Sequence, residues 1–170
     1  MNVPYIQQKD PNSCGVAALE MLYRFYGVDT LDQLEVYERI KTPAPHGNDN
    51  FYVLASSLKA EAEAGGFKVE LVYPNDLQKS FEILEQSVRE NVPVIVIQRF
   101  TEELPEVGHF RVVTNINKKY VRFHDPSSLK NVGGKDKRWS REKFSRFWQA
   151  NANRVVPEGG YLILRKVTSD

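Results

Sequence analysis

The chain has 170 residues, of which 41% are hydrophobic, which is the size and composition of one globular domain. Its 23 basic and 22 acidic residues leave a net charge of +1, so no overall field directs it to nucleic acid or to an anionic membrane. The single cysteine, Cys14, excludes an intrachain disulfide framework and any zinc site that needs two thiolates. The sequence shows neither a signal peptide nor an apolar run of the roughly 20 residues that a membrane span needs, so we expect a cytoplasmic protein.

No internal repeat, low-complexity tract or linker divides the chain, so residues 1–170 are expected to form one domain. Helical patterns dominate up to about residue 91, and strand patterns follow from about residue 92. Helices followed by strands favour an α+β fold, with N-terminal helices packed on a C-terminal antiparallel β-sheet, over alternating βαβ units.

The first predicted helix covers residues 14–26 and ends at Gly27, which suits a left-handed C-cap. Apolar residues occupy most of its circumference, and Glu20 pairs with Arg24 on the remaining strip, so we expect a central, buried helix. A second helix is predicted to begin at Thr30, whose hydroxyl can cap it. This helix would turn inward the apolar side chains Leu31, Leu34, Tyr37 and Ile40.

The loop of residues 41–50 contains two prolines and a glycine, and it holds His46, a candidate to border a cleft. A third helix is predicted over residues 51–64, and a strand over residues 67–73. Asp76 then caps a fourth amphipathic helix. Its inward face would carry Leu77, Phe81, Leu84 and Val88.

The second half of the chain is predicted to supply strands at residues 94–98, 109–116, 120–125 and 161–166. The middle two form a hairpin across Asn117, Lys118 and Lys119. Residues 126–138 are expected to be a loop, and Ser140 can cap a short helix that ends at Trp148.

Residues 135–146 contain six basic and two acidic side chains, interleaved with aromatic residues. Such a segment could bind RNA or an acidic peptide. Because the chain as a whole has no strong charge, we expect no nucleic acid and keep residues 135–148 as a candidate surface for a partner protein. A solvated helix face explains the charges better. In that interpretation the aromatic residues pack inward, namely Trp139, Phe144, Phe147 and Trp148.

Cys14 stands at the first turn of the predicted buried helix, where free backbone N–H groups and the positive end of the helix dipole favour an anion. A thiolate there is stabilised and can act as a nucleophile. The alternative is that Cys14 is a small apolar side chain in the core. Gln8 lies six positions earlier, and its carboxamide N–H could stabilise an oxyanion beside the sulfur, although a glutamine in a loop is more commonly only solvated.

His109 begins one strand of the predicted hairpin, and Asp125 ends the other. With the turn centred near residue 118, their side chains should face each other at the open end of the hairpin. A carboxylate that accepts from one imidazole nitrogen leaves the other nitrogen to take a thiol proton. Such a pair can also be purely structural. His124 should point to the opposite sheet face, so it is a poor candidate for this role.

The stretches QQKDPNSCGVAALEMLYRFYG, GHFRVV and YVRFHDP, in this order and spacing, resemble the C39-like branch of the papain-like cysteine peptidases. The resemblance covers most of the chain and implies a papain-like fold. It also implies Cys14 as the nucleophile, His109 as general base and acid, and Asp125 as the orienting carboxylate. Gln8 and the backbone N–H of Cys14 would form the oxyanion hole.

The resemblance implies thiol-dependent hydrolysis of a peptide or protein substrate, with no cofactor and no metal. Exporter members of this group cleave leader peptides after Gly-Gly, but this chain has neither membrane spans nor a nucleotide-binding motif, and it is more similar to the free-standing form. Two alternatives stay open: acyl transfer of the transglutaminase or deamidase kind, and a silent peptide-binding domain. The chain's own Gly159-Gly160 pair precedes a strand and is interpreted as a turn rather than a processing site.

Overall fold

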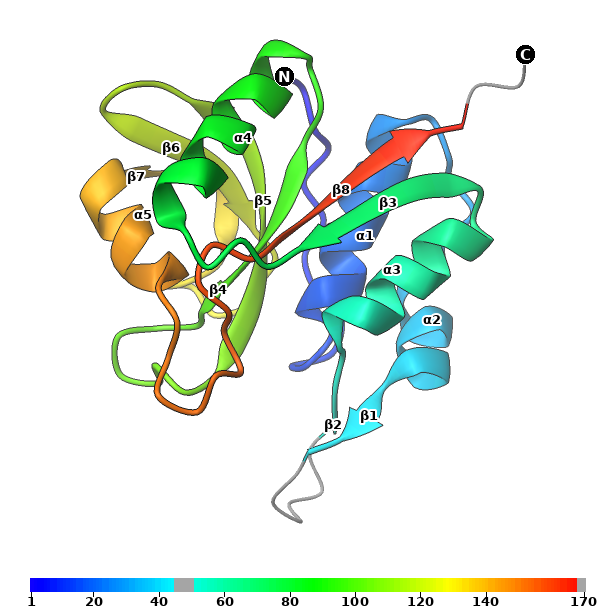
Figure 1. Cartoon of the computed structure of the whole chain (residues 1–170). Helices are drawn as coiled ribbons and strands as arrows, with labels where there is room; N and C mark the ends of the chain where they lie inside the picture. The colour runs from blue at the N-terminus through cyan, green and yellow to red at the C-terminus, as the bar shows by residue number, and fades with distance from the viewer. Residues whose placement is uncertain (45–50, 168–170) are drawn as a thin grey trace.

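The computed structural model describes residues 1–44 and 51–167, which form an α+β fold (Figure 1). The helices of this part are α1 (Cys14–Phe25), α2 (Gln33–Ile40), α3 (Ala55–Ala64), α4 (Leu77–Arg89) and α5 (Arg141–Trp148). The main sheet contains β3 (Phe67–Val72), β4 (Val94–Arg99), β5 (Gly108–Ile116), β6 (Tyr120–Asp125), β7 (Gly134–Ser140) and β8 (Tyr161–Lys166). Two short strands, β1 (Thr42–Pro43) and β2 (Phe51–Tyr52), pair separately.

The main sheet is antiparallel throughout, with the strand order β3-β8-β4-β5-β6-β7. The C-terminal strand β8 is therefore not at an edge, because it pairs with β3 on one side and β4 on the other. Strand β3 comes from the part of the chain where helical patterns dominate, yet it forms one edge of this sheet. The helical part of the chain, up to about residue 91, thus contributes one strand to the sheet that residues after 92 form.

Helices cover both faces of the sheet: α1, α2 and α3 lie on one side, and α4 and α5 on the other (Figure 1). Successive side chains of a strand point to opposite faces. In β4, Ile95 and Ile97 consequently join the core under α1, whereas Val94 and Val96 join the core under α4 and α5. Burial on both faces explains why β4 is an unbroken apolar run.

Helix α1 confirms the first predicted helix, with residues Gly15 to Tyr23 buried. The predicted Glu20–Arg24 ion pair forms at 2.9 Å, and Glu20 is itself buried. Its second carboxylate oxygen accepts a hydrogen bond from Gln33 Nε2 at 3.1 Å. Gly27 has a φ of 74°, in keeping with the predicted left-handed position.

The predicted start of the second helix at Thr30 is wrong, because Asp32 caps α2 by accepting the N–H groups of Leu34 and Glu35. Of the apolar residues expected on its inward face, Tyr37 is buried, whereas Leu34 is 46% exposed. The buried residues of α2 are Gln33, Val36 and Tyr37. The third predicted helix also begins later, at Ala55, since Phe51 and Tyr52 form β2.

Residues 134–138, expected to belong to a loop, instead form most of strand β7, which pairs with β6. The sequence shows no alternation of apolar and polar residues here, because Trp139 is the one large apolar residue of this strand. The aromatic residues of segment 135–148 do pack inward as predicted, with Trp139 lying 4.5 Å from Phe147 and 4.7 Å from Phe123 between ring centroids. Packing in the core therefore explains why segment 135–148 is rich in aromatic residues.

Gly159 and Gly160 form a buried turn before β8, as predicted. Gly159 has a φ of 67°, and its carbonyl accepts a hydrogen bond from Ser80 Oγ at 2.9 Å. The carbonyl of Gly160 accepts one from Trp148 Nε1 at 2.9 Å. A buried, hydrogen-bonded backbone of this kind fits a structural turn.

Phe81 tests the packing of α4. Its side chain is 7% exposed and contacts Trp148 edge to face, with ring centroids 5.5 Å apart. Phe81→Ala is expected to lower the free energy of unfolding by about 3–5 kcal/mol, as measured by urea denaturation. The neighbouring exposed residue provides the control, Glu82→Ala, which should change it by no more than about 0.5 kcal/mol. A loss below about 1 kcal/mol for Phe81→Ala would contradict this packing.

His46 lies outside the described residues. Within residues 1–44 and 51–167, none of the helices combines the length and the apolar character needed to cross a membrane.

Candidate active site

Cys14 is the first residue of α1, directly after a loop that is tightly held by hydrogen bonds. The buried Ser13 Oγ donates to the carbonyl of Asp10 at 3.0 Å, and the Ser13 N–H donates to the same carbonyl. The loop is also tied to α2, because the Lys9 N–H donates to Gln33 Oε1. The position of the thiol is therefore fixed by local turns and by a neighbouring helix.

Gly15 lets the first turn of α1 approach β5 closely. A Cβ atom at this position would lie 2.8 Å from Leu58 Cδ1 and 3.0 Å from the ring of Phe110, so no larger residue fits without movement. Phe110 follows His109 on β5. The glycine thus allows Cys14 and His109, which are far apart in the sequence, to meet.

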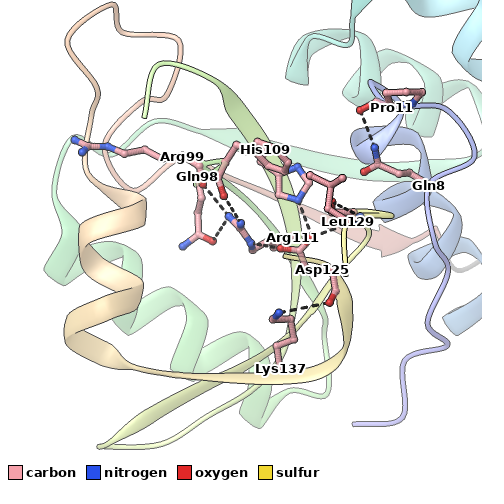
Figure 2. A network of polar contacts seen from close by, with 12 residues as sticks. Gln8, Pro11, Gln98, Arg99, His109, Arg111, Asp125, Leu129 and Lys137 are labelled. Atoms are coloured by element: carbon pink, nitrogen blue, oxygen red, sulfur yellow. Dashed lines mark hydrogen bonds and ion pairs between the residues drawn. The ribbon is translucent and has the colours of Figure 1, made fainter. Parts of the chain in front are cut away.

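His109 and Asp125 come together as the sequence predicts, with His109 Nε2 2.8 Å from Asp125 Oδ1 (Figure 2). Both side chains are buried, and the ring of Phe100 lies 4.9 Å from the His109 ring between centroids. The Ser127 N–H also donates to Asp125 Oδ1, at 3.0 Å. Because Nε2 is occupied by the carboxylate, Nδ1 is the nitrogen that remains for the thiol.

The predicted register of this pair is wrong, although the contact is present. The ladder pairs Val112 with His124 and shifts at Val113/Asn115, where the strand is irregular. One step further, this register sets Arg111 opposite Asp125, so His109 reaches the carboxylate diagonally. His109 and Asp125 would be directly opposite only in a hairpin centred at residue 117, whereas the pairs Val112/His124 and Val113/Phe123 are centred at residue 118.

Arg111 is the residue that the sequence analysis missed. It is completely buried, and its Nε donates to Asp125 Oδ2 at 2.6 Å (Figure 2). The available signal was its position two residues after His109 on a strand, which places both side chains on the same face. An arginine on a predicted strand is usually solvated, so this position alone does not predict a buried ion pair.

The charges of the site support an ion pair between thiol and imidazole. Burial raises the pKa of the Cys14 thiol, but the charge of His109, a hydrogen bond with its ring and one with the Phe110 backbone outweigh burial, so the pKa is lowered. Burial lowers the pKa of His109, whereas Asp125 and Cys14 raise it above its usual value. Although burial opposes it, the positive charges of His109 and Arg111 hold the pKa of Asp125 well below its usual range.

Gln8 lies near the site but holds the chain that leads to it. Its backbone N–H donates to the carbonyl of Pro126 at 2.8 Å. Its Nε2 donates to the backbone carbonyls of Asp10 at 3.0 Å and Pro11 at 2.7 Å (Figure 2). Its Oε1 is buried and has no partner among the described residues. The carboxamide therefore closes the loop before Cys14, and in the described part of the chain it makes no hydrogen bond with that residue.

His124 takes no part in this cluster, as the sequence predicts. Its Nε2 lies 2.9 Å from the carbonyl of Val3, and its Nδ1 accepts the N–H of Asp136 at 3.0 Å. Both nitrogens are thus used to join the N-terminal arm to β7. In residues 1–44 and 51–167, no three or more His, Cys, Asp or Glu side chains gather as a metal site.

The chain matches one protein family and shares its fold with several solved structures. The family model described as the Peptidase_C39 like family matches residues 1–156. A putative C39-like peptidase from Bacillus anthracis has a similar structure, with a TM-score of 0.72 and 23% identity over 99% of this chain and 96% of that chain. No curated protein matches the chain significantly.

Two further structures share the fold. The peptidase domain of Streptococcus ComA, a bi-functional ABC transporter involved in quorum sensing, has a TM-score of 0.65 and 20% identity, covering 96% of this chain and 100% of that chain. A double glycine motif protease from an AMS/PCAT transporter, in complex with the leader peptide, has a TM-score of 0.62 and 22% identity, covering 98% of this chain and 93% of that chain. At these identities the likeness concerns the fold. Because the family model covers most of the chain, the protein belongs to the Peptidase_C39 like family.

Proposed function

We propose that the protein hydrolyses a peptide bond, or a related amide, through an acyl-enzyme formed on Cys14. The observation that carries this proposal is the buried His109–Asp125 pair beside a thiol whose pKa is lowered at the start of α1. A thiolate stabilised by an imidazolium is a nucleophile at neutral pH. The carboxylate fixes the ring so that one nitrogen faces the sulfur.

The reaction proceeds in two steps. The Cys14 sulfur attacks the carbonyl carbon, and the imidazolium of His109 gives its proton to the leaving amine as the amide bond breaks. Water then attacks the thioester, His109 accepts the water proton, and the carboxylic product leaves as the sulfur regains its electron pair. Asp125 orients the ring in both steps. The Cys14 N–H stabilises the oxyanion, and the Gln8 carboxamide joins it when Nε2 releases one of the two carbonyls, of Asp10 and Pro11, that it holds in this structure.

We propose peptides with small residues before the scissile bond, such as Gly-Gly in a leader or tail, as the substrate class. The support is the shared fold with a double glycine motif protease that was solved with its leader peptide. Hydrolysis and transfer to an amine use the same acyl-enzyme, so the product must distinguish them.

The test is incubation of the protein with a peptide library that includes Gly-Gly sequences, with product masses recorded with and without an added primary amine. Hydrolysis predicts a free carboxylate product in both mixtures and none with Cys14→Ala. A product that carries the amine would replace hydrolysis by acyl transfer. Equal turnover by wild type and Cys14→Ala would refute the thiol mechanism.

The role of Gln8 is tested by Gln8→Ala. Loss of an oxyanion donor is expected to lower kcat by about 10²–10³-fold. Gln7 is an exposed neighbour, so Gln7→Ala serves as the control and should keep the wild-type kcat. If Gln8→Ala lowers the unfolding temperature but leaves kcat unchanged in the folded protein, the carboxamide is only a clamp for the Asp10–Pro11 turn.

A further inference from the structure

We propose that Arg111 is a positioning residue of the candidate site: it holds Asp125 in place, ties the carboxylate to the strand end that carries Phe100, and balances the charge of the Cys14–His109–Asp125 chain. This inference rests on the proposed function, because it assigns these residues a chemical role. It concerns a group that does not touch the substrate.

The two oxygens of the Asp125 carboxylate have different partners. Oδ1 faces His109 at 2.8 Å, and Oδ2 accepts Arg111 Nε at 2.6 Å. The two partners lie on the same strand, two residues apart, and each uses a different oxygen. A carboxylate held at both oxygens cannot rotate away from the imidazole, so Arg111 fixes the direction from which His109 is contacted.

The other side of the guanidinium is anchored to β4 and the loop after it. Nη1 donates to Gln98 Oε1 at 3.3 Å and to the carbonyl of Arg99 at 2.9 Å (Figure 2). Nη2 donates to the carbonyl of Phe100 at 2.8 Å. The ring of Phe100 packs on His109. The guanidinium therefore fixes the position of the Asp125 carboxylate and of the Phe100 backbone, which in turn places the Phe100 ring on the imidazole.

Aromatic rings enclose the guanidinium. Its central carbon lies 4.9 Å from the centroid of Trp139 and 5.6 Å from that of Phe147, and the side chain is 0% exposed. Water cannot solvate a charge in this position. Among the residues that the structure describes, Asp125 is the acidic partner of Arg111. Because Asp125 also contacts His109, the charge of Arg111 is coupled through this carboxylate to the imidazole.

The charges of the four side chains of the site add to zero when the thiol and the imidazole form an ion pair. Cys14 and Asp125 are negative, and His109 and Arg111 are positive. The charge of Arg111 lowers the pKa of His109, and Arg111 and Cys14 attract each other. Without Arg111 the cluster would have a net charge of −1, which disfavours the thiolate and favours the imidazolium. Both titrations should then move to higher pH.

The other ionisable side chains near these four residues have partners outside the site. Lys137 of β7 donates to the carbonyl of Gly133 at 3.4 Å, and Lys143 of α5 lies 4.8 Å from the Trp139 centroid. The Arg99 side chain of β4 donates to the carbonyls of residues 149 and 150. On the N-terminal arm, burial raises the pKa of Tyr5, with a further contribution from Asp125, so Tyr5 is neutral in the pH range of interest.

The test compares wild type with Arg111→Met, which removes the charge, and Arg111→Lys, which keeps it. Arg122→Met is the control, because Arg122 is exposed on the neighbouring strand β6. Two readouts are independent of peptide cleavage: the pH dependence of Cys14 alkylation by iodoacetamide, and the titration of the His109 ring by NMR. We expect both midpoints to rise by about one unit in Arg111→Met, and to stay near wild type in Arg111→Lys and Arg122→Met.

Unchanged midpoints in a folded Arg111→Met protein would overturn the proposal and leave Arg111 a purely structural residue. If that variant does not fold, the wild-type protein decides: the Arg111 Nε–H resonance should shift with the thiol titration and lose this shift in Cys14→Ser. A resonance that ignores the thiol titration would equally overturn the proposal. Failure to cleave any peptide would refute the proposed function while leaving these titrations unchanged.

Discussion

Asp125→Asn is expected to lower kcat about 10⁴-fold and to destabilise the folded protein by about 3–5 kcal/mol. The loss of activity follows because an amide that donates to His109 Nε2 selects the wrong tautomer, so Nδ1 carries a proton that it should accept. The loss of stability follows because the fully buried Arg111 is left without its counterion.

Peptide turnover and urea denaturation at pH 7 measure the two effects. Asp29 is a suitable control, because its side chain is 83% exposed, and Asp29→Asn should change neither quantity appreciably. An Asp125→Asn protein that keeps more than about a tenth of the wild-type kcat would contradict the role of the carboxylate.

The stability difference should also depend on pH in a defined direction. The pKa of Asp125 is lowered in the folded protein, so its contribution to stability is complete above the unfolded value of about 3.9 and is lost as the pH falls toward the folded value. Asp125→Asn lacks this contribution at every pH. Asp125 also raises the pKa of His109, and that contribution is complete below the unfolded histidine value of about 6.5 and is lost as the pH rises through the folded value. The difference between wild type and variant should therefore be largest between about pH 4 and 6.5, and become smaller both in acid and as His109 loses its proton.

Cys14→Ala is expected to reduce kcat by about 10⁵–10⁶-fold, to the background level, because it removes the nucleophile. The unfolding temperature should change little, since the thiol is only partly buried and alanine fits the first turn of α1. Cys14→Ser provides the matched variant, because its hydroxyl keeps the shape of the side chain but is not ionised near pH 7. Turnover by either variant above about a hundredth of wild type would contradict nucleophilic catalysis by Cys14.

The parts of the fold that the sequence predicts well have strong local signals. Helix α1 combines an apolar pattern with Gly27 at its end, and the β5–β6 hairpin has a short polar turn. The start of α2 was missed because two capping residues, Thr30 and Asp32, stand two positions apart, and only the folded structure decides between them. Strand β7 was missed because its residues are mostly charged.

The candidate site divides in the same way. The contact between His109 and Asp125 follows from hairpin spacing, and the start of α1 places Cys14. The shift in register at Val113/Asn115 depends on a local irregularity that leaves no clear trace in the sequence. Arg111 depends on the burial of a charge between β4, β6 and α5, which requires the tertiary structure. Contacts between residues that are far apart in the sequence are difficult to predict from one sequence.

The central claim is that Cys14 and His109 form a thiolate–imidazolium pair. The rate of Cys14 alkylation by iodoacetamide as a function of pH tests it most directly, in wild type and in His109→Ala. The pair predicts a wild-type midpoint well below the free-thiol value of about 8.5, and a midpoint at or above that value in His109→Ala, where burial acts alone. A wild-type midpoint at the free-thiol value, unchanged by His109→Ala, would contradict the account.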